Sequence, residues 1–295
     1  MGLSKEMRMD LLPIKKTVLC ADGYLLQYRT WTPNGVPCAT IILVNGIMSH
    51  SGWFQPLAES LLLAGFKLIG ADRRGTGLNL EARGDAPDAK TLIDDLKCVI
   101  ESEDTKGVPL HLVGWCWGAV LAINFAAEHE SLLRSLVLLT PGLYPTDLVK
   151  ANMRSQEQIR KSSLPTAPCL ESPIAETMFT DGPFLESFIA NDVQRTKYFT
   201  PRFYNVMVKM GMGASIRLMQ IHLPLLLVLA DADQATDNIQ TMRAFEQIKQ
   251  PFKLVTLYSA HGIQFDAPEH LSHILASWII GSEHRGASPQ EKHSC

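Results

Sequence analysis

The sequence lacks the residue clusters that would build a metal or cofactor site. Its six cysteines are scattered, no two of them form a C-x-x-C pair, and none stands with histidines at the spacing of a zinc site. An even number of scattered cysteines is weak support for disulfides in a chain with this cytosolic character, so we expect reduced thiols. Nucleotide-binding loops and cofactor lysine motifs are also missing. We therefore predict no metal and no cofactor.

The chain also lacks a dominant charge and a long hydrophobic run. Its 27 Lys and Arg residues stand against 30 Asp and Glu residues, for a formal net charge of −3. Without a basic excess, we expect no binding to nucleic acid. The longest apolar run, LPLLLVLA at 223–230, is far too short to cross a bilayer. The first residues have no apolar core of a signal peptide, so we expect a cytoplasmic protein without stable membrane insertion.

Short apolar segments alternate along the chain with longer amphipathic segments. This β-α-β-α order predicts a mainly parallel sheet that is covered by helices on both faces. The two first strands are expected to form a hairpin across the turn Ala21-Asp22-Gly23. The strand candidates are 16–20, 24–31, 40–45, 67–72, 110–115, 133–141, 223–233 and 252–259.

The alternation stops between Gly142 and Ile221, where six prolines separate short helical pieces rich in Met and Phe. We interpret this segment as a helical cap inserted between two core strands, because a structureless excursion of this length is uncommon in a compact domain. The predicted organisation has two core parts with the cap between them and a polar disordered tail after them. The ranges are 1–141 and 222–280 for the core, 142–221 for the cap and 281–295 for the tail.

The segment GWCWG at 114–118 has the spacing of a nucleophile elbow, with cysteine where serine is usual. It stands between an apolar strand candidate and an alanine-rich helix candidate, as that motif requires. A nucleophile on such a sharp turn needs small residues two positions away, and Gly114 and Gly118 are small. The helix N-terminus also stabilises a thiolate. We therefore predict that Cys116 is a nucleophile, although a lone buried cysteine is by default a small hydrophobic residue.

Two backbone amides are expected to form the oxyanion hole. The amide of Trp117 is the first free donor of the helix that follows the elbow. The second donor is expected after the first buried strand, where Gly46 permits a close backbone approach and Ile47 supplies the amide. We further predict that Trp115 and Met48 bind substrate as an apolar wall, with packing against sheet and cap as the alternative for Trp115.

A general base and an acid that orients it are expected after later strands. His261 follows the last strand candidate, on a loop, and is the predicted base. Asp233 lies on the loop that leaves the strand before it and is the predicted acid, with Asp231 as the alternative. Together these residues give a triad in which Cys116 attacks, His261 transfers protons and Asp233 fixes the imidazole tautomer.

These motifs give the chain a resemblance to the α/β-hydrolase superfamily, and most of all to the serine aminopeptidase-like branch with monoacylglycerol lipases and lysophospholipases. The similarity covers nearly everything from Leu19 to Ile280. It implies an α/β-hydrolase fold, with a mainly parallel eight-stranded sheet flanked by helices and a helical cap. The segments that carry it are NGIMSHSGWFQPLAESLLLAGFKLIGADRRGTG, GWCWG, LLLVLADAD and YSAHG.

The resemblance implies that Cys116, Asp233 and His261 form the triad. The run from Asp72 to Gly77 matches the D-x-R-G-x-G turn of the family, which shapes the scaffold beneath the site. Two residues depart from the family pattern, since histidine is usual at the position of Asn45 and serine at the position of Cys116. A cysteine in the elbow is similar to dienelactone hydrolases and polyhydroxyalkanoate synthases.

Cysteine changes the expected chemistry because a thiolate is both a strong nucleophile and a good leaving group. We expect an acyl-Cys enzyme that hydrolyses a lipophilic acyl thioester, ester or lactone, as a hydrolase or thioesterase. The alternative is an acyltransferase or cyclase in a biosynthetic pathway, which passes the acyl group from a thioester to an amine, alcohol or carbon nucleophile. In both cases the partner is a small acyl substrate, free or carried on coenzyme A or a carrier protein. A non-catalytic binding protein on the same fold is the third hypothesis.

Overall fold

A single twisted sheet organises the protein. The computed structural model describes residues 11–103, 105, 107–180 and 182–286, and within them eight strands form one sheet in the order β1-β2-β4-β3-β5-β6-β9-β10. The last six strands of this order are parallel, while β2 is antiparallel to both of its neighbours. The strands are β1 (Ile14–Leu19), β2 (Leu25–Trp31), β3 (Thr40–Val44), β4 (Lys67–Ala71), β5 (Leu110–Trp115), β6 (Ser135–Leu139), β9 (Leu225–Ala230) and β10 (Phe252–Leu257).

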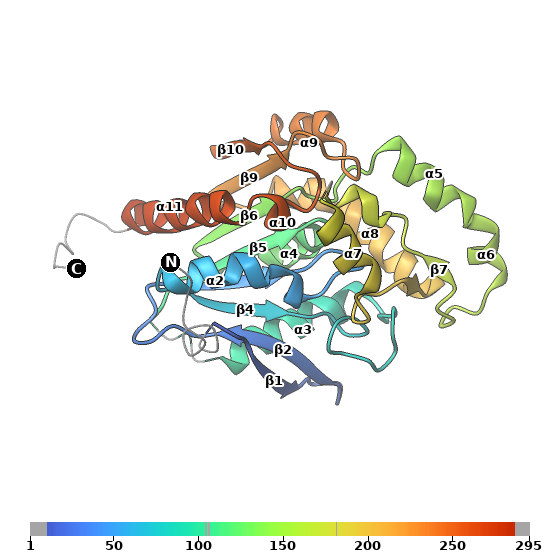
Figure 1. Cartoon of the computed structure of the whole chain (residues 1–295), viewed down its shortest axis with the longest axis horizontal. Coiled ribbons are helices and arrows are strands. Elements are labelled where there is room, and N and C mark those ends of the chain that lie inside the picture. Colours follow the sequence, from blue (N-terminus) through green and yellow to red (C-terminus); the bar gives the residue numbers. More distant parts are fainter. Residues whose placement is uncertain (1–10, 104, 106, 181, 287–295) are drawn as a thin grey trace.

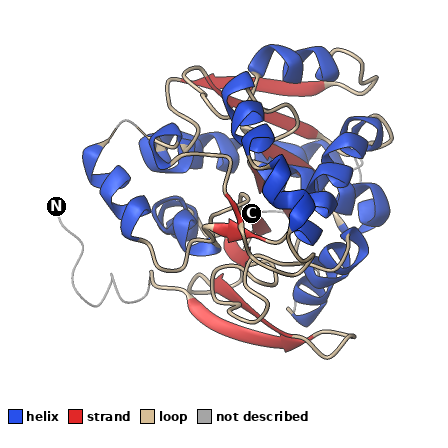
Figure 2. Ribbon diagram, turned by 90° about the vertical axis from the view of Figure 1, so that its right-hand side faces the viewer, coloured by secondary structure: helices blue, strands red, loops and turns tan. Residues whose placement is uncertain are grey.

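Helices cover the two faces of the sheet (Figures 1 and 2). Helices α3 and α4 contact each other on one face, while α2 and α11 contact each other on the opposite face. The predicted mainly parallel sheet with helices on both sides is confirmed. The core helices are α2 (Gln55–Leu63), α3 (Ala89–Ser102), α4 (Trp117–His129), α9 (Asn238–Phe245), α10 (Ile263–Asp266) and α11 (Pro268–Gly286), with the short 3₁₀ turns η1 (Ser51–Phe54) and η2 (Glu130–Leu132).

The central strands are buried along their whole length because helices exclude water from both of their faces. Every residue of β3, β4, β5, β6 and β9 is buried, whereas the edge strand β1 is mostly exposed. All carboxyl ends of the parallel strands lie at one edge of the sheet. Loops that leave these ends can therefore bring together residues that are far apart in the sequence.

The segment expected to form a cap, 142–221, leaves the sheet after β6 and returns to it before β9. In Figure 1, α5 and α6 lie at the right-hand end of the molecule, while α8 packs against α4 of the core. Besides helices and connecting loops, its described residues contain the two-stranded sheet of β7 and β8. Its elements are α5 (Asp147–Ser155), α6 (Glu157–Ser162), β7 (Leu170–Glu171), η3 (Glu176–Met178), α7 (Pro183–Asn191), β8 (Tyr198–Phe199) and α8 (Pro201–Leu218).

A largely buried polar network fastens this segment to the core. Asp192 accepts hydrogen bonds from Trp53 Nε1 at 2.6 Å and pairs with His50 Nε2 at 2.8 Å. Arg29 Nη2 donates to Gln194 Oε1 at 2.7 Å. Buried polar groups stabilise a structure only when they are paired, and these pairs fix the position of the loop after α7.

The C-terminal helix is longer than expected. α11 continues to Gly286, whereas the sequence predicted that ordered structure ends at residue 280. The rest of the predicted disordered tail, 287–295, lies outside the described residues. None of the helices in the described part of the chain combines the length and the apolar character that crossing a membrane requires.

The two register partners Leu227 and Leu254 test how much the buried strands contribute to stability. Leu227 on β9 is fully buried, while its neighbour Leu254 on the edge strand β10 is 42% exposed. We expect Leu227→Ala to lower the free energy of unfolding by about 2–5 kcal/mol, because it leaves a cavity in the core. Leu254→Ala serves as the matched control and costs less than about 1 kcal/mol. Urea denaturation measures both, and equal losses would contradict the assigned burial.

Candidate active site

Cys116 occupies a strained turn between β5 and α4. Its backbone lies in the left-handed region, with φ of 56°, which is rare for a residue other than glycine. A Cβ atom on Gly118 would stand 2.3 Å from the carbonyl oxygen of Val44, and one on Gly114 would stand 2.6 Å from Cα of Ala119. Glycine is therefore required at both positions, which is the reason that the elbow spacing could be recognised in the sequence.

Hydrogen bonds from neighbouring segments hold this conformation. The Cys116 amide donates to the Leu139 carbonyl at 3.0 Å. The Cys116 carbonyl accepts from the Ala119 amide at 3.0 Å and from the Gly142 amide at 2.8 Å. The turn is thus tied to β6, to its own helix and to the first residue of the predicted cap, so that the thiol has a defined position.

His261 and Asp233 meet next to this turn, on the loops that follow β10 and β9. The Nδ1 atom of His261 lies 2.8 Å from Oδ2 of Asp233, and both side chains are inaccessible to solvent. Asp233 accepts three further bonds, from the Ala235 amide at 2.8 Å, the Thr236 amide at 2.9 Å and the Thr236 hydroxyl at 2.7 Å. The carboxylate is therefore held in a fixed orientation toward the imidazole.

The alternative acid, Asp231, does not reach this position. Its Oδ1 atom accepts a hydrogen bond from the Ser259 amide at 3.0 Å, and its side chain is exposed. Asp231 therefore braces the loop before His261, while Asp233 contacts the imidazole itself.

The electrostatics of the pair favour a charged imidazole. Burial alone would lower the pKa of His261, but attraction to Asp233 and Cys116 outweighs burial and raises it to about 10. Burial would likewise raise the pKa of Asp233, whereas the His261 charge and the hydrogen bonds lower it. With Nδ1 bound to Asp233, the Nε2 atom is left for Cys116, and no conventional hydrogen bond reaches Nε2 from the described residues. Catalytic hydrogen bonds are often long before substrate binds.

Cys116 opens onto an apolar cavity of about 380 Å³ together with Ile47 and Trp117, the residues predicted to form the oxyanion hole. Most of the remaining wall comes from the segment between β6 and β9. Sequence reasoning identified the Met-rich character of this segment but not the individual wall residues, which depend on how α5 and α8 pack. They include Tyr144, Val149, Met153, Ile174, Met207, Val208, Gly211 and Met212.

Trp115 and Met48 do not line this cavity. Trp115 is fully buried, and its ring lies against His261 with centroids 5.8 Å apart. Its Nε1 atom donates to the His261 carbonyl at 3.1 Å. Met48 is also buried, with its sulfur 3.5 Å from the Ser172 hydroxyl. The structure therefore gives these two residues packing roles and no support as substrate-binding residues, because the strand and the loop turn their side chains into the core.

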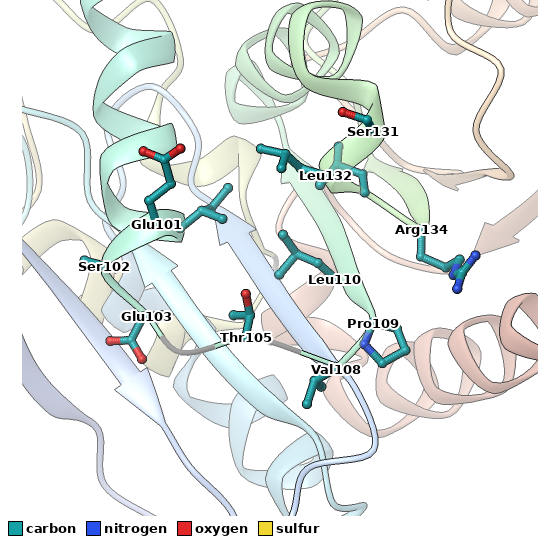
Figure 3. A pocket seen from close by; sticks show the side chains of 12 residues that line it. Glu101, Ser102, Glu103, Thr105, Val108, Pro109, Leu110, Ser131, Leu132 and Arg134 are labelled. Carbon is teal, nitrogen blue, oxygen red and sulfur yellow. The ribbon is translucent and has the colours of Figure 1, made fainter.

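A second and larger hollow, of about 870 Å³, lies at the opposite edge of the sheet (Figure 3). Leu110, the first residue of β5, lines it, together with Glu101 from the end of α3 and Arg134 from the loop before β6. Cys116 follows the other end of β5, so this hollow is remote from the thiol. Ligands of parallel sheets bind outside the carboxyl ends of the strands, which favours the smaller cavity at Cys116.

The sheet order and the strand–turn–helix at Cys116 define the class of the protein as an α/β-hydrolase fold. Within this class, the family model of the serine aminopeptidases S33 matches residues 35–267, and the chain belongs to that family. Cys116 stands at the elbow position where the name of the family implies serine.

Individual relatives are distant. Human monoglyceride lipase is 24% identical over 280 residues, which cover 88% of each chain. An uncharacterized abhydrolase domain-containing protein of Dictyostelium discoideum is 24% identical over 89% of this chain, but the match spans only 28% of that larger protein. The structure of a soluble variant of monoglyceride lipase from Saccharomyces cerevisiae, in complex with a substrate analogue, superposes with a TM-score of 0.81 at 17% identity, over 92% of this chain and 96% of the other.

The pairing of His261 with Asp233 predicts that Asp233 raises the pKa of His261. We expect Asp233→Asn to lower the pKa of His261 strongly, because the attraction is lost while the burial penalty stays. Histidine-labelled NMR measures the titration, with His261→Gln assigning the signal. Asp237→Asn, which keeps a side chain able to cap α9, is the matched control and should leave the His261 midpoint in place. An unchanged midpoint in Asp233→Asn would contradict the pairing.

The same pKa shift links protonation to stability. A free imidazole titrates near pH 6.5, below the folded-state value of about 10 for His261. Protonated His261 therefore stabilises the folded state fully below about pH 6.5, and this contribution is lost as the pH rises toward 10.

Proposed function

We propose that the protein is an acyl-transfer enzyme that hydrolyses a lipophilic acyl thioester, ester or lactone through a covalent intermediate on Cys116. One observation carries this proposal: a cysteine on a nucleophile elbow opens onto an apolar cavity beside a buried His261–Asp233 pair. A core cysteine would need neither the strained backbone nor a histidine that is oriented by a carboxylate.

In the proposed reaction, the thiol proton of Cys116 resides on His261 Nε2, in keeping with the charged imidazole, and the Cys116 sulfur attacks the acyl carbonyl carbon. The carbonyl π electrons move to oxygen, and the amides of Ile47 and Trp117 donate hydrogen bonds to the resulting oxyanion. Collapse of the tetrahedral intermediate breaks the bond to the leaving group, which receives the proton from His261. Water then attacks the acyl-Cys116 thioester with His261 as base, and the acid and the free thiol are released.

Cysteine favours substrates with a good leaving group. The thiolate leaves a tetrahedral intermediate more readily than an alkoxide does, so attack on an ordinary ester tends to reverse unless His261 protonates the alkoxide. A thioester avoids this handicap, because its own leaving group is also a thiolate, and a strained lactone avoids it by releasing strain. We therefore propose thioesters or strained lactones before simple esters.

The cavity supports a lipophilic acyl group. Its wall is built mainly of aliphatic and Met side chains, and such surfaces bind an acyl chain by removing apolar area from water. The likeness to a lipase acting on monoglycerides supports the same substrate class. We propose that the acyl group is free or is carried on coenzyme A or a carrier protein. We expect the reaction to take place in the cytoplasm.

Acyl transfer is the second candidate, and the nucleophile itself favours it. An acyl-Cys intermediate is a thioester, which reacts with amines, thiols and carbanions more readily relative to water than an oxygen ester does. The elbow is also enclosed, with Cys116 2% exposed, which limits the access of water. An acceptor that enters the cavity would then collect the acyl group in place of water.

Intact mass spectrometry with acyl thioesters tests the nucleophile. We expect an acyl adduct on the wild-type chain, no adduct on Cys116→Ala, and loss of at least about 10³-fold in turnover with that variant. Cys98→Ala is the matched control, because that thiol is half-buried and lies away from the elbow. Full activity in Cys116→Ala would contradict the proposed role of Cys116. Added amines or alcohols distinguish the two candidates, since free acid alone indicates a hydrolase and a new amide or ester indicates a transferase.

Two glycines of α8 test whether the cavity holds the acyl chain. Gly211 lines the cavity and Gly213 does not, while a Cβ atom on either would meet nothing within 4 Å beyond its chain neighbours and the backbone of its own helix. We expect Gly211→Leu to lower kcat/KM for long acyl chains by about 10-fold relative to short ones, because the new side chain fills the site. Gly213→Leu should leave the ratio unchanged. Equal chain-length profiles for both variants and wild type would show that the acyl group binds elsewhere.

A further inference from the structure

A guanidinium group is buried directly behind the loop that carries Ile47. Arg73 follows β4 and is only 4% exposed. It donates three hydrogen bonds to consecutive carbonyl groups of that loop: to Asn45 at 3.2 Å, to Gly46 at 2.8 Å and to Ile47 at 2.6 Å. A single cation therefore fixes the direction of three successive peptide groups.

This arrangement turns the amides of the loop away from Arg73. In a trans peptide the N–H points opposite to the C=O, and the Gly46 carbonyl shares its peptide group with the Ile47 amide. The loop passes next to the thiol on its other side, since a Cβ atom on Gly46 would lie 3.1 Å from Cβ of Cys116 and 3.5 Å from its sulfur. With the carbonyls held by Arg73, the Ile47 amide is free to serve the oxyanion site.

Arg73 retains its charge without a carboxylate partner. Burial lowers its pKa to about 10, and attraction to Asp72 and Cys116 opposes that shift, so the group is protonated at neutral pH. Yet among the described residues no carboxylate oxygen pairs with it, because Asp72 pairs with Arg29 at 2.9 Å and accepts from the Ser51 amide at 2.5 Å. The guanidinium carbon instead lies 5.0 Å from the ring centre of Trp117, which follows the nucleophile.

Burying a cation without a carboxylate partner costs free energy, and negative charge that develops nearby offsets this cost. The proposed reaction places negative charge on the Cys116 sulfur and then on the substrate oxygen. We propose that Arg73 is a positioning residue for this reaction: it orients the Ile47 amide toward the oxyanion and supplies the positive field behind the site. This inference rests on the proposed function of Cys116.

A purely structural role would give different results, and the loop allows the two to be separated. The Asn45 side chain also braces the loop, because its amide donates to the Gly46 carbonyl at 3.1 Å and to the Ser49 carbonyl at 2.6 Å. The loop therefore keeps support when Arg73 is replaced. The neighbouring Arg74 offers a matched comparison, since it is bound by both oxygens of Asp95 at 2.6 Å and donates to none of the three carbonyls.

The experiment compares Arg73→Met, Arg73→Lys and Arg74→Lys with the wild-type chain. Turnover of an acyl thioester is measured with affinity for two ligands of the same chain length: a trifluoromethyl ketone, which the thiol converts to an ionised adduct, and the corresponding methyl ketone, which reports binding alone. We expect Arg73→Met to lower kcat by about 10²-fold and trifluoromethyl ketone affinity by a similar factor, because the positive charge behind the oxyanion is lost and the Ile47 amide is held less firmly. KM and methyl ketone affinity should change less than about 3-fold.

Arg73→Lys keeps the charge but has only one donor atom, so we expect a smaller loss of kcat than in Arg73→Met. Arg74→Lys should leave kcat unchanged, whatever its effect on stability. If Arg73→Met does not fold, the two lysine variants are compared instead. A loss of kcat in Arg73→Lys but not in Arg74→Lys supports the inference, and equal kcat in both overturns it. Unchanged kcat in Arg73→Lys and Arg73→Met, or equal losses for both ketones, would overturn the inference while acylation of wild-type Cys116 still stands. Absence of acylation in the wild type would overturn the proposed function and this inference together.

Discussion

The left-handed backbone at Cys116 is the constraint on which the rest of the site depends. A non-glycine residue keeps such a conformation only where its surroundings hold it, and here β6, α4 and Gly142 all bond to its peptide groups. Other backbone passes very close to this turn, and the absence of a side chain at Gly114 and Gly118 permits it. The loop of Gly46 and Ile47, the His261 imidazole and the Arg73 guanidinium are therefore arranged around a residue that the junction of β5 and α4 holds in place.

Much of this arrangement could be predicted from the sequence, because a tight turn requires glycine at defined positions. Glycines at two positions, an apolar strand before them and an alanine-rich helix after them identify the elbow. The order of strands then places His261 and Asp233 on loops at the same edge of the sheet, which the geometry confirms for their contact. The choice between Asp233 and Asp231 needed coordinates, since the two side chains differ only in which way the loop turns them.

Contacts between distant segments could not be predicted in the same way. Trp115 adjoins Cys116 in the sequence, yet its ring packs against His261 and not along the cavity. Arg73 looks like one more residue of a turn motif, and its three carbonyl partners lie 26 to 28 positions away. Such roles depend on how β3 and β4 lie side by side, and the residues next to Arg73 in the sequence do not indicate these contacts.

The origin of the cavity wall has a consequence for how this protein can diversify. Cys116, His261 and the loop of Ile47 all come from the core, while α5 and α8, which enclose the acyl group in our proposal, belong to one segment between β6 and β9. In our proposal, most residues that select the acyl substrate therefore lie in one continuous stretch of the sequence, separate from Cys116, His261 and Asp233. Under this proposal, evolution or design can replace that stretch as one unit and change the substrate while Cys116, His261 and Asp233 stay in place.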